Sequence, residues 1–130
     1  MDARRDTIKR QRLTLSGADG NTLCADLFIP PCIVHGLVVL VHGGGQTRHS
    51  WGGTARTLAG RGWIALAYDQ RGHGDSDWIA DAAYGSEHYA RDLIAVARQM
   101  AEYGFGTVVA GASLGGIATT LKSTPMTASA

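Results

Sequence analysis

The residues with the clearest chemical potential form the run Gly111-Ala112-Ser113-Leu114-Gly115. The apolar run Thr107-Val108-Val109-Ala110 before it predicts a strand, and Gly116-Ile117-Ala118 after it predicts the start of a helix. A Gly-x-Ser-x-Gly sequence at such a turn lifts the serine hydroxyl clear of a parallel sheet, and the small residues relieve crowding of the strained backbone. The helix would point its free N–H groups at negative charge developing beside the serine. Ser113 is therefore a candidate nucleophile, although the pattern alone also fits an ordinary strand-to-helix turn.

Length, composition and charge narrow the class of protein. The 130 residues suit one domain with a real core, and 45% hydrophobic and 18% charged residues are typical of a globular chain. A net charge of +1 gives no electrostatic case for a nucleic-acid or membrane partner. No secretory signal or membrane-spanning run is found, so we expect a cytoplasmic protein. One basic cluster is interpreted as a solvated face: Arg4, Arg5, Lys9, Arg10 and Arg12.

Metal and nucleotide sites lack sequence support. Cys24 and Cys32 show neither Cys-x-x-Cys nor His spacing, which favours buried reduced thiols over a metal site. Gly43-Gly44-Gly45 is not followed by Gly-Lys-Ser/Thr, and Gly104-Phe105-Gly106 lacks the third glycine of a dinucleotide fingerprint. Ile117 stands where a phosphate-binding lysine would be needed. We therefore expect no cofactor and no metal.

The elements that position Ser113 can be predicted from apolar periodicity. Alternation over residues 8–29, with a turn signal at Ala18-Asp19-Gly20-Asn21, predicts a β-hairpin. Leu37–Val41 and Trp63–Tyr68 are continuous apolar runs typical of strands buried on both faces. A helix is expected between them, ended by Gly60-Arg61-Gly62. The residues assigned to that helix are Ala55, Leu58 and Ala59, with Ser50 or Thr54 as its cap.

A second helix and the order of the elements complete the fold prediction. Ser86 is the expected cap of this helix and Gly104 its stop. The order hairpin, strand, helix, strand, helix, strand, helix predicts an α/β fold, a mostly parallel sheet with flanking helices and an N-terminal β-hairpin. We expect a single partial domain over residues 1–130, with the hairpin at 8–29, a βαβαβα core at 37–121 and a tail at 122–130. The apolar face of the second helix comprises Tyr89, Leu93, Val96, Ala97 and Met100.

Each predicted parallel strand ends in a polar or glycine-rich loop, where open α/β sheets place their sites. The first loop is His42-Gly43-Gly44-Gly45-Gln46-Thr47, and the second runs from Asp69 to Asp77 and includes Arg71-Gly72-His73-Gly74. With the Gly111–Gly115 elbow, these motifs cover nearly all of residues 10–121. In this order and spacing, the sequence resembles the N-terminal half of an α/β-hydrolase fold protein of the esterase and non-haem haloperoxidase type.

The resemblance implies a serine hydrolase that needs no cofactor. Ser113 would attack a small ester-like or related acyl substrate and form an acyl-enzyme. The backbone N–H groups of Gly44 and Leu114 would form the oxyanion hole. Related epoxide hydrolases and dehalogenases carry Asp at the elbow, so Ser113 favours acyl transfer. Neither the particular substrate nor the oligomeric state follows from the sequence.

The histidines are assigned to supporting or surface roles and not to the general base. In the motif loops, His42 and His73 are expected to hold the backbone. The other three are expected at the surface or a pocket rim (His49 and His88) and in a loop (His35).

The remaining triad residues are missing after the elbow. The family order is Ser, then Asp or Glu, then His. Residues 114–130 contain no Asp, Glu or His. Asp69 and Arg71 are interpreted as a charge pair that fixes their loop, not as a triad acid and its partner. Pro125 would also stop the helix after the elbow early.

These observations favour a cytoplasmic serine hydrolase present here without its second half, as a fragment, a frameshift product or a decayed copy. The alternative is a non-catalytic remnant or pseudoenzyme that keeps the elbow for packing. A third reading is a complete miniature enzyme that uses His42 or His73 as its base. Since the strand before Ser113 is central in the family's sheet, we expect it to be an edge here. Val108 and Val109 would then sit on an unpaired edge that later helices should have covered, and the chain would be poorly stable.

Overall fold

The N-terminal hairpin pairs β1 (Lys9–Ser16) with β2 (Thr22–Ile29) in antiparallel fashion, with Leu15 opposite Leu23. Gly20 in the connecting turn has φ of 75°, a left-handed conformation that favours glycine. The hairpin predicted from the alternation is therefore confirmed. This computed structural model describes residues 8–31, 33–78, 84–104 and 106–111.

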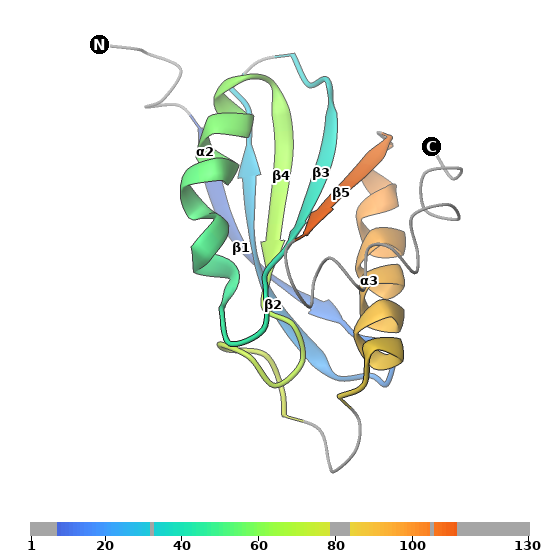
Figure 1. Cartoon of the computed structure of the whole chain (residues 1–130). Coiled ribbons are helices and arrows are strands. Elements are labelled where there is room, and N and C mark those ends of the chain that lie inside the picture. The colour runs from blue at the N-terminus through green and yellow to red at the C-terminus, as the bar shows by residue number, and fades with distance from the viewer. Residues whose placement is uncertain (1–7, 32, 79–83, 105, 112–130) are drawn as a thin grey trace.

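Three parallel strands continue the sheet: β3 (Gly36–Val41), β4 (Trp63–Tyr68) and β5 (Thr107–Gly111). The strand order is β1-β2-β4-β3-β5, with β4 antiparallel to β2 and parallel to β3 (Figure 1). This mixed, mostly parallel sheet with flanking helices confirms the predicted α/β class. The helix expected after the elbow lies outside the described residues.

The parallel strands end at a common level in the sheet. Val41 at the end of β3 is in register with Tyr68 of β4 on one side and with Gly111 of β5 on the other. Neighbouring strands lie about 4.8 Å apart. The loops that begin at His42 and Asp69 therefore leave the sheet side by side, next to Gly111, the last described residue.

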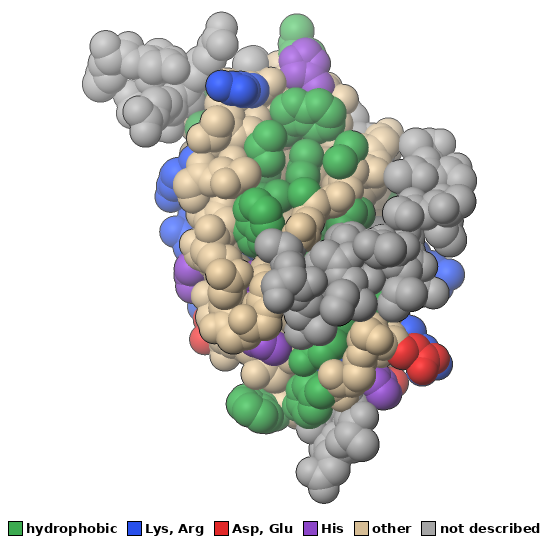
Figure 2. Space-filling view, viewed as in Figure 1, with side chains coloured by type: hydrophobic (Ala, Val, Ile, Leu, Met, Phe, Trp, Pro, Cys, Tyr) green, Lys and Arg blue, Asp and Glu red, His purple; other side chains and the backbone are tan. Residues whose placement is uncertain are grey.

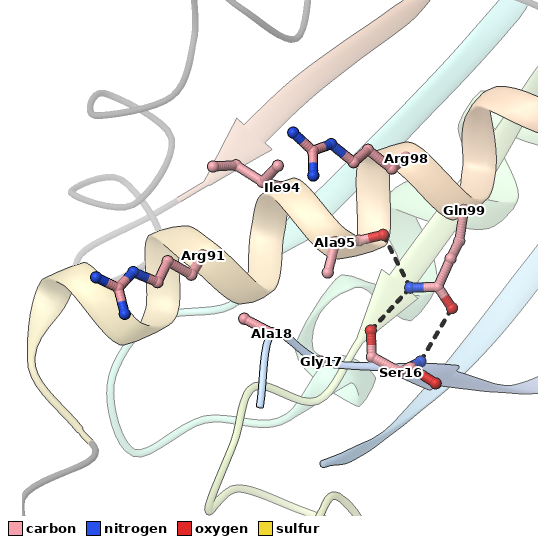
Figure 3. A pocket seen from close by; sticks show the side chains of 8 residues that line it. All are labelled: Ser16, Gly17, Ala18, Arg91, Ile94, Ala95, Arg98 and Gln99. Carbon is pink, nitrogen blue, oxygen red and sulfur yellow. Dashed lines mark hydrogen bonds between the residues drawn. The ribbon is translucent and has the colours of Figure 1, made fainter. Parts of the chain in front are cut away.

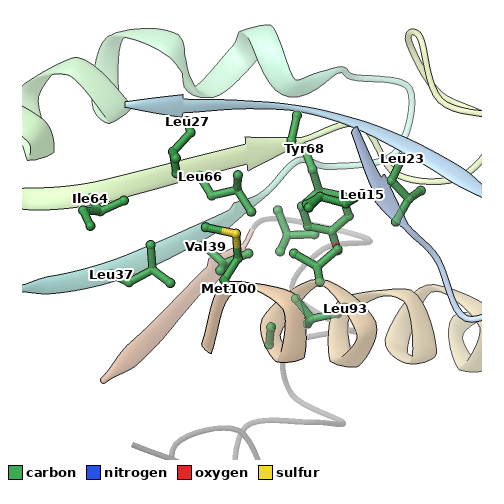
Figure 4. Packing of buried hydrophobic residues seen from close by; sticks show 14 of the residues in the cluster. Leu15, Leu23, Leu27, Leu37, Val39, Ile64, Leu66, Tyr68, Leu93 and Met100 are labelled. Carbon is green, nitrogen blue, oxygen red and sulfur yellow. The ribbon is translucent and has the colours of Figure 1, made fainter. Parts of the chain in front are cut away.

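Each face of the sheet is covered by one helix (Figure 1). On one face, α2 (Gly52–Gly60) buries Ala55 and Ala59 against a cluster that includes Phe28 and Leu40. On the other face, α3 (Ser86–Met100) contributes its apolar side to a larger cluster (Figure 4). All five residues predicted for that side are buried: Tyr89, Leu93, Val96, Ala97 and Met100.

The start of α2 differs from the prediction. A 3-10 turn, η1 (Arg48–Trp51), precedes the helix, and the Thr47 hydroxyl caps it by accepting the His49 N–H at 3.3 Å. Ser50 instead donates its hydroxyl to the Thr47 carbonyl at 2.9 Å. Neither Ser50 nor Thr54 is the cap, because the extra turn moves the first free N–H groups upstream of both.

For α3, the predicted start is wrong by one residue, whereas the predicted stop at Gly104 is confirmed. Gly85 occupies the N-cap position without a side-chain bond, and Ser86 is the first helical residue. A short 3-10 turn, η2 (Ala101–Tyr103), follows the helix and ends at Gly104, whose φ of 77° is left-handed. A glycine in this conformation is a common way to end a helix.

A glutamine joins α3 to the hairpin (Figure 3). The Ser16 N–H donates to Gln99 Oε1 at 3.0 Å, and Gln99 Nε2 donates back to the Ser16 carbonyl at 2.8 Å. The side-chain amide thus bonds the end of β1 as a neighbouring strand would. Beside this contact lies an open hollow of about 500 Å³, lined by Arg91, Ile94 and Arg98 among others.

β5 lies at the edge of the described sheet, as expected from the sequence. Val108 and Val109 both lie on this edge strand, opposite Val38 and Val39 of β3. Val108 is 50% exposed, whereas Val109 is partly buried and packs against the core. Hydrophobic side chains gather on this side of the molecule, over the upper parts of β4, β3 and β5 (Figure 2). This side of the described structure therefore carries exposed apolar surface.

Candidate active site

The His-Gly loop forms a tight turn directly after β3. The Gln46 N–H donates to the Gly43 carbonyl at 3.1 Å, and the Gln46 side chain accepts the Gly43 N–H at 2.9 Å. Gly45 has φ of 75°, as the third residue of a type II turn requires. Gly44 is exposed, and among the described residues its N–H donates no hydrogen bond. The turn therefore presents one backbone donor at the carboxyl edge of the sheet.

His42 ties this loop to the loop after β4. Its Nε2 accepts the Gln70 N–H at 3.0 Å, and its Nδ1 donates to the Gly43 carbonyl at 2.7 Å. The Gln70 side chain completes the link by donating to the His42 carbonyl at 2.9 Å. Burial lowers the pKa of His42 below its usual value, so the ring is neutral at pH 7. With both ring nitrogens occupied, His42 supports the backbone, as predicted.

The other histidines also occupy supporting or surface positions. His73 Nδ1 donates to the Arg71 carbonyl at 3.0 Å, and its ring centroid lies 4.9 Å from that of His42. His49 is exposed in η1, His88 is partly buried in the first turn of α3, and His35 is exposed in the segment before β3. These placements agree with the sequence interpretation.

Asp69 is the anchor between the two loops. Its buried carboxylate accepts the Arg48 N–H on Oδ1 at 2.6 Å and the Asp75 N–H on Oδ2 at 3.0 Å. The Arg48 guanidinium also donates to Oδ2. The same guanidinium bonds Asp26 of β2 at 3.1 Å and the Asp75 carboxylate at 3.0 Å. Arg48 therefore holds the start of η1, β2 and the Asp69–Asp77 loop together.

Arg71 has different partners from those predicted. It is fully buried, and its Nε and Nη2 each lie 2.7 Å from the Asp92 carboxylate of α3. Its Nη1 lies 3.0 Å from Asp19 in the hairpin turn. The predicted Asp69–Arg71 pair is wrong, because Arg48 and Asp92 supply each charge with a buried partner, in fork geometry for Arg71. The hydrogen bonds to Asp92 raise the pKa of Arg71.

The packing around Asp69 explains the small residues of its loop. A Cβ on Gly74 would lie 2.3 Å from Asp69 Oδ2, and Gly74 has φ of 50°. The Ser76 hydroxyl donates to the Asp69 carbonyl at 2.6 Å and accepts the Cys24 N–H at 2.9 Å. Side chains larger than hydrogen at Gly74 would push the Asp75 N–H away from the carboxylate.

Sequence reasoning missed Arg48 and Asp92. Asp92 could have been found, because positions 89, 92, 93 and 96 follow helical spacing on the apolar face of α3, and a carboxylate there must have a buried partner. Arg48 gave no comparable signal. Ser113 and Leu114, the other predicted site residues, lie outside the described residues.

The described part of the chain gives no metal or membrane feature. No group of three or more His, Cys, Asp or Glu side chains within it is placed to hold a metal ion. No helix in the same part is both long and apolar enough to cross a membrane. Cys24 is a buried free thiol that donates to the Asp75 carbonyl at 3.2 Å, and Cys32 lies outside the described residues.

The fold and the strand-end loops define an α/β-hydrolase. The sequence matches the family described as serine aminopeptidase, S33, over residues 33–125. This match spans more than half of the 130 residues, and the chain belongs to that family.

Individual relatives support the same class. An esterase of Mycobacterium tuberculosis is 39% identical over 80 residues, which are 62% of this chain and 25% of the esterase. An α/β hydrolase structure from Novosphingobium aromaticivorans is 28% identical, with a TM-score of 0.73 over 92% of this chain and 41% of that one.

Epoxide hydrolase A from Mycobacterium thermoresistibile shares the fold, with a TM-score of 0.75 at 22% identity over 92% of this chain and 37% of that one. The chain thus spans between 25% and 41% of the length of these proteins.

Proposed function

We propose that this chain carries the nucleophile and the oxyanion hole of a serine hydrolase that acts on an ester-like or related acyl substrate. The observation that carries the proposal is the register of the strand ends. Gly111 pairs with Val41, Ser113 follows Gly111 by two residues, and Gly44 follows Val41 by three. This register supports our proposal that Ser113 and the Gly44 N–H, which has no acceptor among the described residues, meet at one edge of the sheet.

The proposed reaction is acyl transfer in two steps. Ser113 Oγ attacks the substrate carbonyl and loses its proton to a base, and the Gly44 and Leu114 N–H groups hold the oxyanion. Collapse expels the leaving group, which takes up the proton, and water then hydrolyses the acyl-enzyme. Each oxyanion donor is worth about 10² to 10³ in rate. The esterase relative supports an ester as substrate, and the family description supports a peptide amide as the competing acyl class.

The proposed base does not come from the residues of this chain. His42 uses both ring nitrogens in backbone contacts, and His73 uses Nδ1 in one, which argues against His42 as the base of a complete miniature enzyme and favours a supporting role for His73. Residues 114–130 contain no Asp, Glu or His. We therefore propose that an acid and a histidine outside this sequence complete the triad, and that residues 1–130 alone retain only weak reactivity.

The missing acid and histidine also favour the second candidate function, a non-catalytic remnant of the same fold. The genomic sequence downstream of Ala130, read in all frames, separates the two. An Asp and a His in family-like context favour the hydrolase, and their absence favours the remnant.

Labelling by a fluorophosphonate tests the nucleophile directly. We expect slow labelling that Ser113→Ala abolishes and that Ser123→Ala, a control in the same segment, leaves unchanged. Equal labelling of the two variants would refute the assignment of Ser113. Hydrolysis of an activated ester and of an activated anilide, measured in parallel, ranks the two acyl classes.

A pair of substitutions at Gly44 tests the oxyanion hole. Proline suits the second position of a type II turn, so Gly44→Pro removes the N–H while the turn is kept. Gly44→Ala keeps the N–H and serves as the matched control. We expect labelling of the proline variant to be about 10²-fold slower than that of the alanine variant. Equal rates would remove Gly44 from the oxyanion hole.

A further inference from the structure

A small hollow lies away from the His42–Gln70 contact, between β1, β2, η1 and the start of α2. It measures about 140 Å³, and three arginines, Arg10, Arg48 and Arg56, line it together with Asp26 and Phe28. A water molecule in the liquid occupies about 30 Å³, so the hollow is large enough for one small polyatomic group. Its lining is mostly charged or polar, which suits an ion better than an apolar molecule.

The positive charge of this lining exceeds its negative charge. Asp26 is the carboxylate in the lining, and Arg10 and Arg48 share it, each at 3.1 Å. Arg56 makes no ion pair with any described residue. Because Arg48 also contacts the Asp69 and Asp75 carboxylates, Arg56 is the guanidinium of the lining without an ion-pair partner among the described residues, and a bound anion would supply one.

An aromatic ring gathers two of these guanidinium groups. Arg10 and Arg56 lie over Phe28, with their Cζ atoms 5.9 and 5.4 Å from the ring centroid. Both residues are exposed, so N–H donors that are not already bonded can reach a ligand from water. Arg48 is different, because burial and three carboxylates fix it in place.

We propose that this hollow binds a phosphate group, with Arg56 and Arg10 as its main ligands and Arg48 as the fixed base of the site. Guanidinium forks match the oxygens of a phosphate in paired hydrogen bonds. A phosphate offers at least three acceptor oxygens against two for a carboxylate, so it can accept hydrogen bonds from both exposed guanidinium groups at once. A larger molecule bearing the phosphate would extend into solvent, since the hollow holds little beyond that group. The proposal is independent of the chemistry at Ser113.

The hollow beside α3 is a weaker candidate for the same ligand. It is larger, but Arg91 on its lining is already paired with Glu87 at 2.5 Å, and its floor includes Ile94 and Ala95.

Binding of inorganic phosphate to the whole chain tests the proposal. Titration calorimetry and the midpoint of thermal unfolding are measured against phosphate, with sodium chloride adjusted to hold the ionic strength constant. We expect saturable binding, and Arg56→Gln to weaken it about tenfold or more, as loss of a charge-assisted contact implies. This variant is expected to fold, because Arg56 is exposed and has no ion-pair partner among the described residues.

Arg61→Gln is the matched control. It removes the same charge at the C-cap of α2, from an exposed residue outside the hollow, and should change the affinity by less than twofold. Equal weakening by the two variants, or a response that follows ionic strength without saturation, would overturn the proposal. Acetate at the same ionic strength distinguishes a general anion site, which would bind both, from the phosphate site proposed here.

Discussion

Replacing Asp92 by asparagine removes the main partner of Arg71, a fully buried charge. Arg71 would keep Asp19 but lose the charge of Asp92 and one of its two hydrogen bonds, because an amide has a single acceptor oxygen, and its NH2 group would face a guanidinium donor. Breaking a buried ion pair costs about 3–5 kcal/mol. Since half-exposed Asp19 remains, we expect Asp92→Asn to reduce the free energy of unfolding by about 3 kcal/mol, the lower end of that range.

Urea unfolding measures this loss. With an m-value of about 2 kcal/mol per M, the midpoint should fall by about 1.5 M. The control is Arg91→Gln on the same helix, which breaks the exposed Arg91–Glu87 pair and should cost about 0.3–0.5 kcal/mol. Equal shifts of the midpoint in the two variants would show that the buried Arg71–Asp92 pair contributes no more to stability than an exposed pair, which would refute this reasoning.

Three further outcomes are expected. Because the folded state lowers the pKa of His42, the neutral ring stabilises the fold above its ordinary pKa of about 6.5. This stabilisation is lost as the pH falls below that value, by up to about 1.4 kcal/mol per pH unit. Urea midpoints should therefore drop between pH 7.5 and 5.5 in the parent, and should drop less in His42→Gln. Gly74→Ala should destabilise the chain by more than Gly20→Ala, for which we expect a loss of about 1 kcal/mol. Both glycines have left-handed backbones, but of the two only Gly74 has Asp69 where a Cβ would lie, and equal urea midpoints of the two variants would contradict this. If the exposed edge of β5 makes the chain self-associate, Val108→Lys should increase the monomer fraction in analytical ultracentrifugation with little change in thermal midpoint. An unchanged monomer fraction would show that this edge does not cause self-association.

The strands were predictable because each has a strong local signal. The continuous apolar runs Leu37–Val41 and Trp63–Tyr68 became β3 and β4 with a difference of at most one residue. Strands buried between two layers tolerate few polar residues, so sequence alone marks them. The helix starts were less predictable, because several polar residues near a boundary can each serve as a cap and only the path of the chain selects among them.

The charge pairs were not predictable from local sequence. Asp69 and Arg71 are two residues apart, yet each is bonded to a residue 21 positions away, Arg48 and Asp92 respectively. These pairings depend on where η1 and α3 cross the carboxyl edge of the sheet. A motif therefore identifies which loop is polar, whereas the tertiary fold determines which charges meet.

The two donors of the proposed oxyanion hole, the Gly44 and Leu114 N–H groups, belong to segments that differ in how firmly the described structure fixes them. The Gly44 loop is fixed by the His42–Gln70 bonds and by the contacts of Arg48, whereas β5 pairs with β3 alone among the described strands. A slip of one residue along β5 would move the following turn by about 3.3 Å, far beyond the roughly 0.5 Å that a catalytic arrangement tolerates. We therefore expect the position of the proposed nucleophile Ser113 to depend more on a second neighbour for β5 than the position of Gly44 does. Pairing along the edge of β5 that is open in the described sheet is then expected to increase the reactivity of Ser113 without any change in the His-Gly loop.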